Sequence, residues 1–169
     1  MGVRAAIAMA AVIGAMAVTN TDAVAREVVP FKARVEPGTI VVRTKERRLY
    51  YVRGDGTAFR YRVAVGRPDK QWFGEARING KHVRPAWSPP REVKRDNPRL
   101  PDVIPGGAPN NPMGERALTL DLDEYAIHGT NRPNSIGTYA SYGCIRMFNE
   151  DIIDLFDQVS VGTRVVVER

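Results

Sequence analysis

The single cysteine of this 169-residue chain, Cys144, lies in the heptapeptide SYGCIRM. A cysteine becomes a strong nucleophile as its thiolate, which requires a neighbouring base or a positive field that lowers its pKa. The chain contains two histidines, His82 and His128, and His128 stands sixteen residues before Cys144. Glycines and a proline in the intervening segment favour a return loop that could bring these two side chains together. If they do not meet, Cys144 is a small buried hydrophobic residue.

The residues around the sulfur could hold a negatively charged group. In an extended backbone, the side chains of Cys144 and Arg146 lie on the same face, so the guanidinium would stand near the sulfur. There it could bind a carboxylate through two parallel hydrogen bonds. Pairing of Arg146 with an acid of the following segment, such as Asp151, is the alternative. The backbone amides of Gly143 and Cys144 are candidate donors to an oxyanion.

The first 25 residues predict export. Arg4 precedes an apolar run over residues 5–18, and Ala23-Val24-Ala25 has the small-x-small form that a signal peptidase cuts. The run of about 14 residues is shorter than the roughly 20 that span a bilayer. We therefore expect a cleaved signal peptide over residues 1–25 and a periplasmic or cell-envelope location, with an uncleaved anchor as the alternative. A lone cysteine in an oxidising compartment has no partner within the chain, which favours a reactive thiol.

The remaining length and the charge limit the organisation and the partners. Cleavage would leave about 144 residues, a typical size for one domain. We expect a linker over residues 26–38 and one catalytic domain over residues 39–169, with no later segment apolar enough to span a membrane. The formal net charge of +6 favours polyanionic surroundings such as envelope polymers. Scattered basic residues and the exported location argue against nucleic acid as a partner.

Strand signals dominate the chain. Residues 39–45 (TIVVRTK) and 49–53 (LYYVR) are rich in β-branched and aromatic residues. Residues 59–65 (FRYRVAV) alternate in the manner of a half-buried strand. Asn79-Gly80, flanked by short apolar runs, predicts a two-residue hairpin turn. Strand signals return over residues 118–127, and that second run would deliver His128 to a loop edge.

One helix is predicted near the end of the chain. Asn149 is a suitable N-cap, acidic residues follow in the first turn, and apolar residues recur at helical spacing to Val159. A closing strand over residues 164–167 comes next. We therefore expect a predominantly β fold with one helix packed against the sheet.

A proline-rich segment over residues 85–112 interrupts the strands. It holds eight of the twelve prolines, and no regular element fits it. Long loops inside compact domains are usually functional lids or disordered segments. The position between strands favours a lid over passive disorder.

The segment HGTNRPNSIGTYASYGCIRM, with NEDIIDLF after it, resembles the L,D-transpeptidase (YkuD-like, ErfK-YbiS-YcfS-YnhG) catalytic domain. The resemblance covers residues 39–167 and includes Asn111-Pro112-Met113-Gly114, similar to the family's Asn-Pro-Leu-Gly. It implies a YkuD-like β-sandwich of mixed sheets with one packed α-helix and a long proline-rich loop. It also implies an enzyme that acts on peptidoglycan stem peptides.

The resemblance further implies roles for individual residues. Cys144 would be acylated by a stem tetrapeptide with release of D-alanine, His128 would be the base, and the Gly129 carbonyl would orient its ring. The thioester would pass to an amine of another stem peptide, giving a 3-3 cross-link, or to an amine of an envelope protein. Substrate-binding roles fall on residues around the nucleophile, namely Arg146 for a carboxylate, Ser141 and Gly143 as pocket walls, and Tyr142. The Gly143 and Cys144 amides would form the oxyanion site. An L,D-carboxypeptidase, which would resolve the thioester with water, and a non-catalytic peptidoglycan-binding module are the alternatives.

The chain departs from the family pattern at two places. Tyr142 stands where many members have histidine, so any secondary role of that imidazole is absent or passes to the phenol. Residues 69–74 (DKQWFG) replace the family's Thr-Pro-x-Gly, and Trp72 there could line a groove or pack. No cofactor is expected, and no metal, because the aspartates form no ligand cluster. His82 has no partner motif, so we expect it to be a surface or structural residue.

Overall fold

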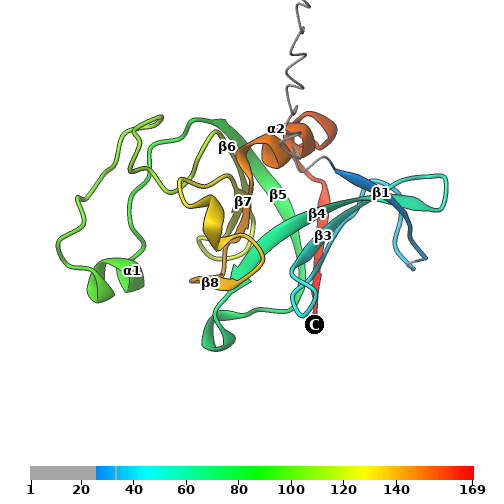
Figure 1. Cartoon of the computed structure of the whole chain (residues 1–169), viewed down its shortest axis with the longest axis horizontal. Coiled ribbons are helices and arrows are strands. Elements are labelled where there is room, and N and C mark those ends of the chain that lie inside the picture. Colours follow the sequence, from blue (N-terminus) through cyan, green and yellow to red (C-terminus); the bar gives the residue numbers. More distant parts are fainter. Residues whose placement is uncertain (1–25, 33) are drawn as a thin grey trace, which may run out of the picture.

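The computed structural model describes residues 26–32 and 34–169, whose arrangement is shown in Figure 1. The expected signal peptide, residues 1–25, lies outside this described part of the chain. Within the described part, no helix is long and apolar enough to cross a membrane.

Ten strands and two α-helices form the described fold. The strands, in chain order, are β1 (Glu27–Pro30), β2 (Ile40–Arg43), β3 (Arg48–Val52), β4 (Thr57–Gly66), β5 (Gly74–Val83), β6 (Arg116–Leu120), β7 (Ala126–His128), β8 (Tyr139–Ser141), β9 (Ile145–Met147) and β10 (Arg164–Glu168). Helix α1 (Arg91–Asp96) lies between β5 and β6, and α2 (Asn149–Gln158) lies between β9 and β10. Two short 3-10 turns, η1 (Pro68–Lys70) and η2 (Pro133–Ser135), follow β4 and β7.

Two long strands join the layers of the sheet. The first part of β4 pairs with β1 and β3, and its last residues pair with β9 and β8. Likewise β5 pairs first with β10 and then with β6. One layer has the order β1-β4-β3-β2-β10-β5 and the other β5-β6-β7-β9-β4. Because both layers contain β4 and β5, the sheet folds back on itself around one core.

The burial pattern confirms the expected mainly β fold. Tyr61, Val63 and Val65 of β4 are buried while Arg62 between them is exposed, as the alternation predicts. The main core combines residues of both layers with the buried face of α2. Full burial of a Leu or Ile side chain contributes about 1.5–3 kcal/mol, so this shared core fixes the strands that carry the site.

The prediction of a hairpin turn at Asn79-Gly80 is wrong. Strand β5 runs through both residues, and its register with β6 shifts between Ile78 and Gly80. An Asn-Gly pair supplies the backbone freedom for a bulge as well as for a tight turn. A Cβ at Gly80 would lie 2.6 Å from the hydroxyl of Thr119, so close packing on β6 requires glycine. The bulge redirects β5 from β10 to β6.

The segment expected to be a linker, residues 26–38, contains β1. This strand pairs with β4, and Phe31 after it is buried and stacks on Tyr50 with ring centroids 4.8 Å apart. A second apolar cluster forms there on the outer side of the first layer. At least part of the segment is therefore integral to the folded domain.

The proline-rich segment is ordered and contains a regular element that its composition did not predict. Helix α1 begins directly after Pro90, and a β-bridge joins Trp87 to Ile104. None of the six α1 residues is buried. In Figure 1 this segment projects beyond the two layers, on the side where β8 lies. The helix is thus held by contacts with the rim of the site rather than by the core.

Helix α2 buries the face expected from its spacing but begins differently. Phe148 occupies the N-cap position and makes no side-chain cap, so the expected cap by Asn149 is wrong. The Asn149 carboxamide instead accepts from the amides of Glu115 and Thr130 and donates to the Thr130 carbonyl, at 3.1–3.2 Å. It binds two loops that border the site, which is a tertiary role.

Candidate active site

Strands β7 and β9 bring the predicted catalytic residues together. They are parallel neighbours in which Ile127 is paired with Ile145 and His128 with Arg146. Since alternate residues of a strand share a face, Cys144 and Arg146 lie on the same side as His128. All three line one pocket of about 660 Å³. The return loop expected between His128 and Cys144 is therefore present, with η2 and β8 inside it.

His128 is held as a neutral imidazole. The ring is buried, and Nδ1 donates to the Gly129 carbonyl at 2.7 Å, because a carbonyl oxygen can only accept. This bond leaves Nε2 as the nitrogen that can take a proton. Burial, then the positive charge of Arg146, lower the pKa of His128 to about 4 despite opposing contributions from the Gly129 and Pro112 carbonyls.

The backbone around His128 is constrained by close packing. A Cβ at Gly129 would come 2.2 Å from the Asn149 side-chain oxygen, so only glycine fits there. The Asn149 bonds to Thr130 and Glu115 fix the same turn. The carbonyl that orients the imidazole is therefore held in place by a residue of α2.

The Cys144 sulfur is also neutral in the resting protein. Enclosure by surrounding protein raises the pKa of its thiol, while the Ala126 amide, Arg146 and the cysteine's own amide lower it. Within the described residues, the sulfur lies 4.0 Å from the Glu124 carbonyl oxygen. A neutral thiol beside a neutral imidazole implies that proton transfer accompanies attack on a substrate.

Arg146 places a cation in the pocket without a carboxylate partner. The alternative pairing with Asp151 does not form, and no ion pair of Arg146 exists within the described residues. Its Nε is buried and has no hydrogen-bond partner there. Burial is the main cause that lowers the pKa of Arg146, and nearby Arg132 adds to it. An anion from outside the chain would satisfy this group.

Ser141 and Gly143 define the backbone before the sulfur. The Ser141 hydroxyl donates to the Cys144 carbonyl at 2.5 Å and accepts the Gly143 amide at 3.1 Å. The Gly143 amide is thus already bound, which differs from its expected role as an oxyanion donor. The Cys144 amide has no acceptor among the described residues, so it is the donor of this pair that remains free.

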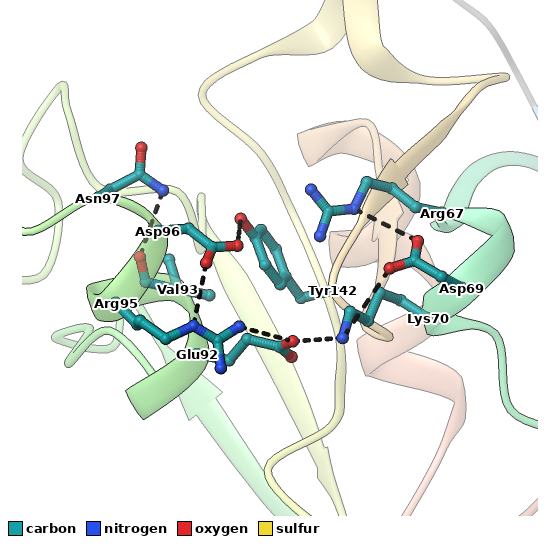
Figure 2. A network of polar contacts seen from close by, with 9 residues as sticks. All are labelled: Arg67, Asp69, Lys70, Glu92, Val93, Arg95, Asp96, Asn97 and Tyr142. Atoms are coloured by element: carbon teal, nitrogen blue, oxygen red, sulfur yellow. Dashed lines mark hydrogen bonds and ion pairs between the residues drawn. The ribbon is translucent and has the colours of Figure 1, made fainter.

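Tyr142 lines the same pocket as Cys144 and His128, and it also holds the proline-rich segment. Its hydroxyl donates to Asp96 of α1 at 2.9 Å, and the Arg67 guanidinium lies 4.1 Å from the ring centroid. Figure 2 shows this contact beside a second link, the ion pair of Lys70 with Glu92. The first link joins Tyr142, directly after β8, to α1, and the second joins Lys70 of η1 to α1. The proline-rich segment also lines the pocket, with residues such as Val93 and Leu100. The segment is therefore an ordered lid.

Two further residues support the site through contacts that the sequence analysis did not assign to them. The Trp72 indole donates to the Gly143 carbonyl at 3.0 Å and stacks on Tyr125. Buried Asn111 donates to the Pro85, Ile104 and Pro105 carbonyls and accepts the Met113 amide, which ties the two ends of the lid together. The match of residues 111–114 to the family pattern was the available signal for Asn111. Nothing in the sequence indicated the contact of Trp72.

Of the other candidates, His82 and Asp151 lie away from the pocket, whereas Trp87 is part of its wall. His82 is exposed on β5, where its ring lies 3.4 Å from the Thr119 hydroxyl. Asp151 is buried in α2, and Trp87 lines the pocket from the lid. In residues 26–32 and 34–169, no group of three or more His, Cys, Asp or Glu could hold a metal ion.

Comparisons with known proteins agree with this geometry. The family model described as the YkuD L,D-transpeptidase catalytic domain matches residues 37–167. Probable L,D-transpeptidase YbiS of Escherichia coli K12 is 40% identical over 135 residues, which are 75% of this chain and 43% of that protein. Probable L,D-transpeptidase ErfK/SrfK of the same strain is 38% identical over 137 residues, with shares of 76% and 43%. The chain therefore spans less than half the length of these relatives.

Solved structures show the same fold. The catalytic domain of the E. faecium L,D-transpeptidase, determined by NMR, has a TM-score of 0.61 at 19% identity. The alignment covers 80% of this chain and 100% of that one.

Proposed function

The chain belongs to the L,D-transpeptidase (YkuD) family, and on that premise we propose that it is an exported cysteine acyltransferase acting on peptidoglycan stem peptides. The donor is a stem tetrapeptide, and the acceptor is the amine of a second stem peptide or of an envelope protein. The observation that carries the proposal is the presence in one pocket of Cys144, His128 and an Arg146 that forms no ion pair within residues 26–32 and 34–169.

In the first half-reaction, Cys144 Sγ attacks the carbonyl of the third residue of the donor. The thiol proton passes to His128 Nε2, and the Cys144 amide donates to the oxyanion that forms. Collapse of this intermediate breaks the peptide bond, and the departing amine of D-alanine takes the proton from His128. A thioester between the tripeptide and Cys144 remains.

In the second half-reaction, an acceptor amine attacks the thioester carbonyl. The amine gives its proton to His128, and the thiolate leaves and recovers the proton. Arg146 would bind a carboxylate of the stem peptide, which supplies the missing anion and orients the donor. The lid contributes apolar wall around the reacting carbonyl, which favours transfer to an amine over attack by water.

The test is incubation of the purified protein with a disaccharide-tetrapeptide, followed by mass spectrometry of the products. We expect release of D-alanine and formation of a cross-linked dimer. Tripeptide in place of dimer would identify the protein as an L,D-carboxypeptidase and contradict the acyltransferase proposal. If no D-alanine appears and Cys144→Ala binds isolated peptidoglycan as well as the unaltered protein does, the chain is a binding module.

A further inference from the structure

The peptide bond between Gly143 and Cys144 has one end fixed and one end free. Its carbonyl accepts the Trp72 indole N–H at 3.0 Å, while its N–H, that of Cys144, has no acceptor among the described residues. The described residues contain no cis peptide bond, so the C=O and the N–H of this unit point in opposite directions. Any group that fixes the carbonyl therefore also fixes the direction of the amide.

Trp72 is itself held by an aromatic stack. Its ring lies parallel to that of Tyr125, with a centroid distance of 5.5 Å and an interplanar angle of 6°. Tyr125 in turn covers the α-carbon of Gly143, where a Cβ would come 2.2 Å from the phenol ring. The indole, the phenol ring and the glycine thus form one packed unit beside the nucleophile.

The indole bond also changes the strength of the amide as a donor. A hydrogen bond accepted by a peptide carbonyl polarises the unit and makes its N–H a better donor. The free N–H belongs to the residue that carries the nucleophilic sulfur, so it is a backbone donor beside the point where attack by that sulfur would form an oxyanion. Tyr125 and Cys144 line the pocket, but its wall does not include Trp72. An effect of Trp72 on the reaction must therefore pass through this peptide.

We propose that Trp72 is a positioning residue that aims and polarises the Cys144 amide for stabilising the oxyanion of acyl transfer. The inference rests on the proposed acyl chemistry at Cys144 but not on the identity of the acyl donor. It gives residues 69–74, where the chain departs from its family, a defined part in the reaction. A merely structural Trp72 would affect every reaction of the sulfur alike.

The experiment compares two reactions of the same sulfur in the full chain. With p-nitrophenyl acetate, the thiol displaces p-nitrophenolate through an oxyanion intermediate, and an S-acetyl group remains. With iodoacetamide, a carbon–sulfur bond forms as iodide leaves, and no oxyanion arises. The variant Trp72→Phe keeps a ring for the stack on Tyr125 but removes the N–H.

We expect Trp72→Phe to slow acetylation about tenfold, less than the 10²–10³ for deleting an oxyanion donor outright, and to leave alkylation nearly unchanged. Trp72→His, which restores a ring N–H, should recover part of the loss. Tyr51→Phe is the matched control, because it removes a bond from an aromatic side chain to the Gln158 carbonyl at the far end of α2. Circular dichroism would report folding of each variant.

Equal slowing of both reactions, or no slowing of either, would overturn the proposal. If Trp72→Phe does not fold, Trp72→His serves as the test variant. A fall in its acetylation rate that is matched by an equal fall in its alkylation rate would also overturn the proposal. Neither reagent is a stem peptide, so this test does not depend on the proposed substrate. If the protein releases no D-alanine but Trp72→Phe slows acetylation and not alkylation, the proposed substrate is refuted and the role of Trp72 is supported.

Discussion

At the scale of single residues, the enclosure of His128 sets the pH response of the reaction. With a pKa of about 4, the imidazole is an available base well below pH 6.5, where an exposed histidine would already be protonated. We expect the rate of acylation to stay high down to about pH 5 and to fall only near pH 4. A pH profile of acylation measures this, and a decline centred near pH 6.5 would contradict a buried neutral base.

The same burial couples His128 to stability. Its pKa is lower in the folded protein than in the unfolded chain, so the unfolded chain takes up the proton first as the pH falls. The contribution of His128 to stability is therefore fully present above about pH 6.5 and is lost as the pH falls towards 4, by up to ~3 kcal/mol. Urea unfolding over this range should show a smaller loss for His128→Gln. An identical loss in both proteins would assign the effect to other groups.

The contribution of Asp151 to stability depends on pH in the opposite direction to that of His128. Burial, followed by the charges of Glu150 and Asp154, raises its pKa to about 7, and its Oδ2 has no hydrogen-bond partner among the described residues. The folded protein holds this proton when the unfolded chain has lost it, so the contribution of Asp151 to stability falls as the pH rises from about 4 to 7. We expect Asp151→Asn to stabilise the protein at pH 8 by about 1–2 kcal/mol and to have little effect near pH 4. Urea unfolding at the two pH values tests this, and destabilisation at pH 8 would contradict it.

That Cys144, His128 and Arg146 would lie together could be predicted, because their types and spacing are local signals. Cys144, His128 and Arg146 meet because two short strands are paired in parallel. The partners of Tyr142, Trp72 and Asn149 depend on segments more than ten residues away, which only the folded chain brings close. For that reason the sequence did not indicate that Tyr142 holds α1, and it assigned Asn149 to a helix cap.

At the scale of elements, the lid is held over the pocket by two polar links at its rim, Tyr142 with Asp96 and Lys70 with Glu92. We expect the double variant Tyr142→Phe with Lys70→Gln to loosen α1, because it removes the contacts to Asp96 and Glu92. Trypsin cleavage within residues 91–99 and alkylation of Cys144 by iodoacetamide should both become severalfold faster.

Arg43→Gln is the control for the lid, because it breaks an ion pair with Glu168 between β2 and β10, away from the pocket. Unchanged proteolysis of the double variant would show that Asn111 and the proline-rich backbone hold the lid without these links.

The hydrophobic pattern predicted whether a segment is a strand or a helix better than it predicted where the segment ends and how it is connected. Period-two alternation identified β4 because one of its faces is buried. The Asn-Gly pair was read as a turn because its backbone preferences suit turns and bulges alike. Helix α1 has no buried residue and therefore no apolar pattern to predict it.

At the scale of the whole molecule, the net charge of +6 predicts how the protein meets an anionic polymer. Much of this attraction acts between exposed charges and is screened by salt. We expect retention on isolated peptidoglycan to fall severalfold as the salt concentration rises from low values to about 0.5 M. A sedimentation assay with Cys144→Ala measures binding without turnover. Salt-independent retention would show that contacts in the pocket dominate.

The shared strands β4 and β5 give the molecule one continuous core, in which neighbouring strands come from distant parts of the chain. Strand β10 inserts between β2 and β5, and β9 closes onto β4. Fold class could be predicted from the strand pattern, and the family resemblance implied the two-layer architecture. The strand order itself depends on long-range pairing, which alternation along a strand does not encode.

The central claim is that Cys144 forms a thioester with a stem tripeptide and that His128 is the base. Intact-mass analysis after brief mixing with the disaccharide-tetrapeptide, followed by peptide mapping, tests it most directly. We predict a disaccharide-tripeptide adduct on Cys144 of the unaltered protein and of His82→Gln, and none on His128→Gln. An adduct on another residue, or equal adduct formation by both histidine variants, would contradict the account.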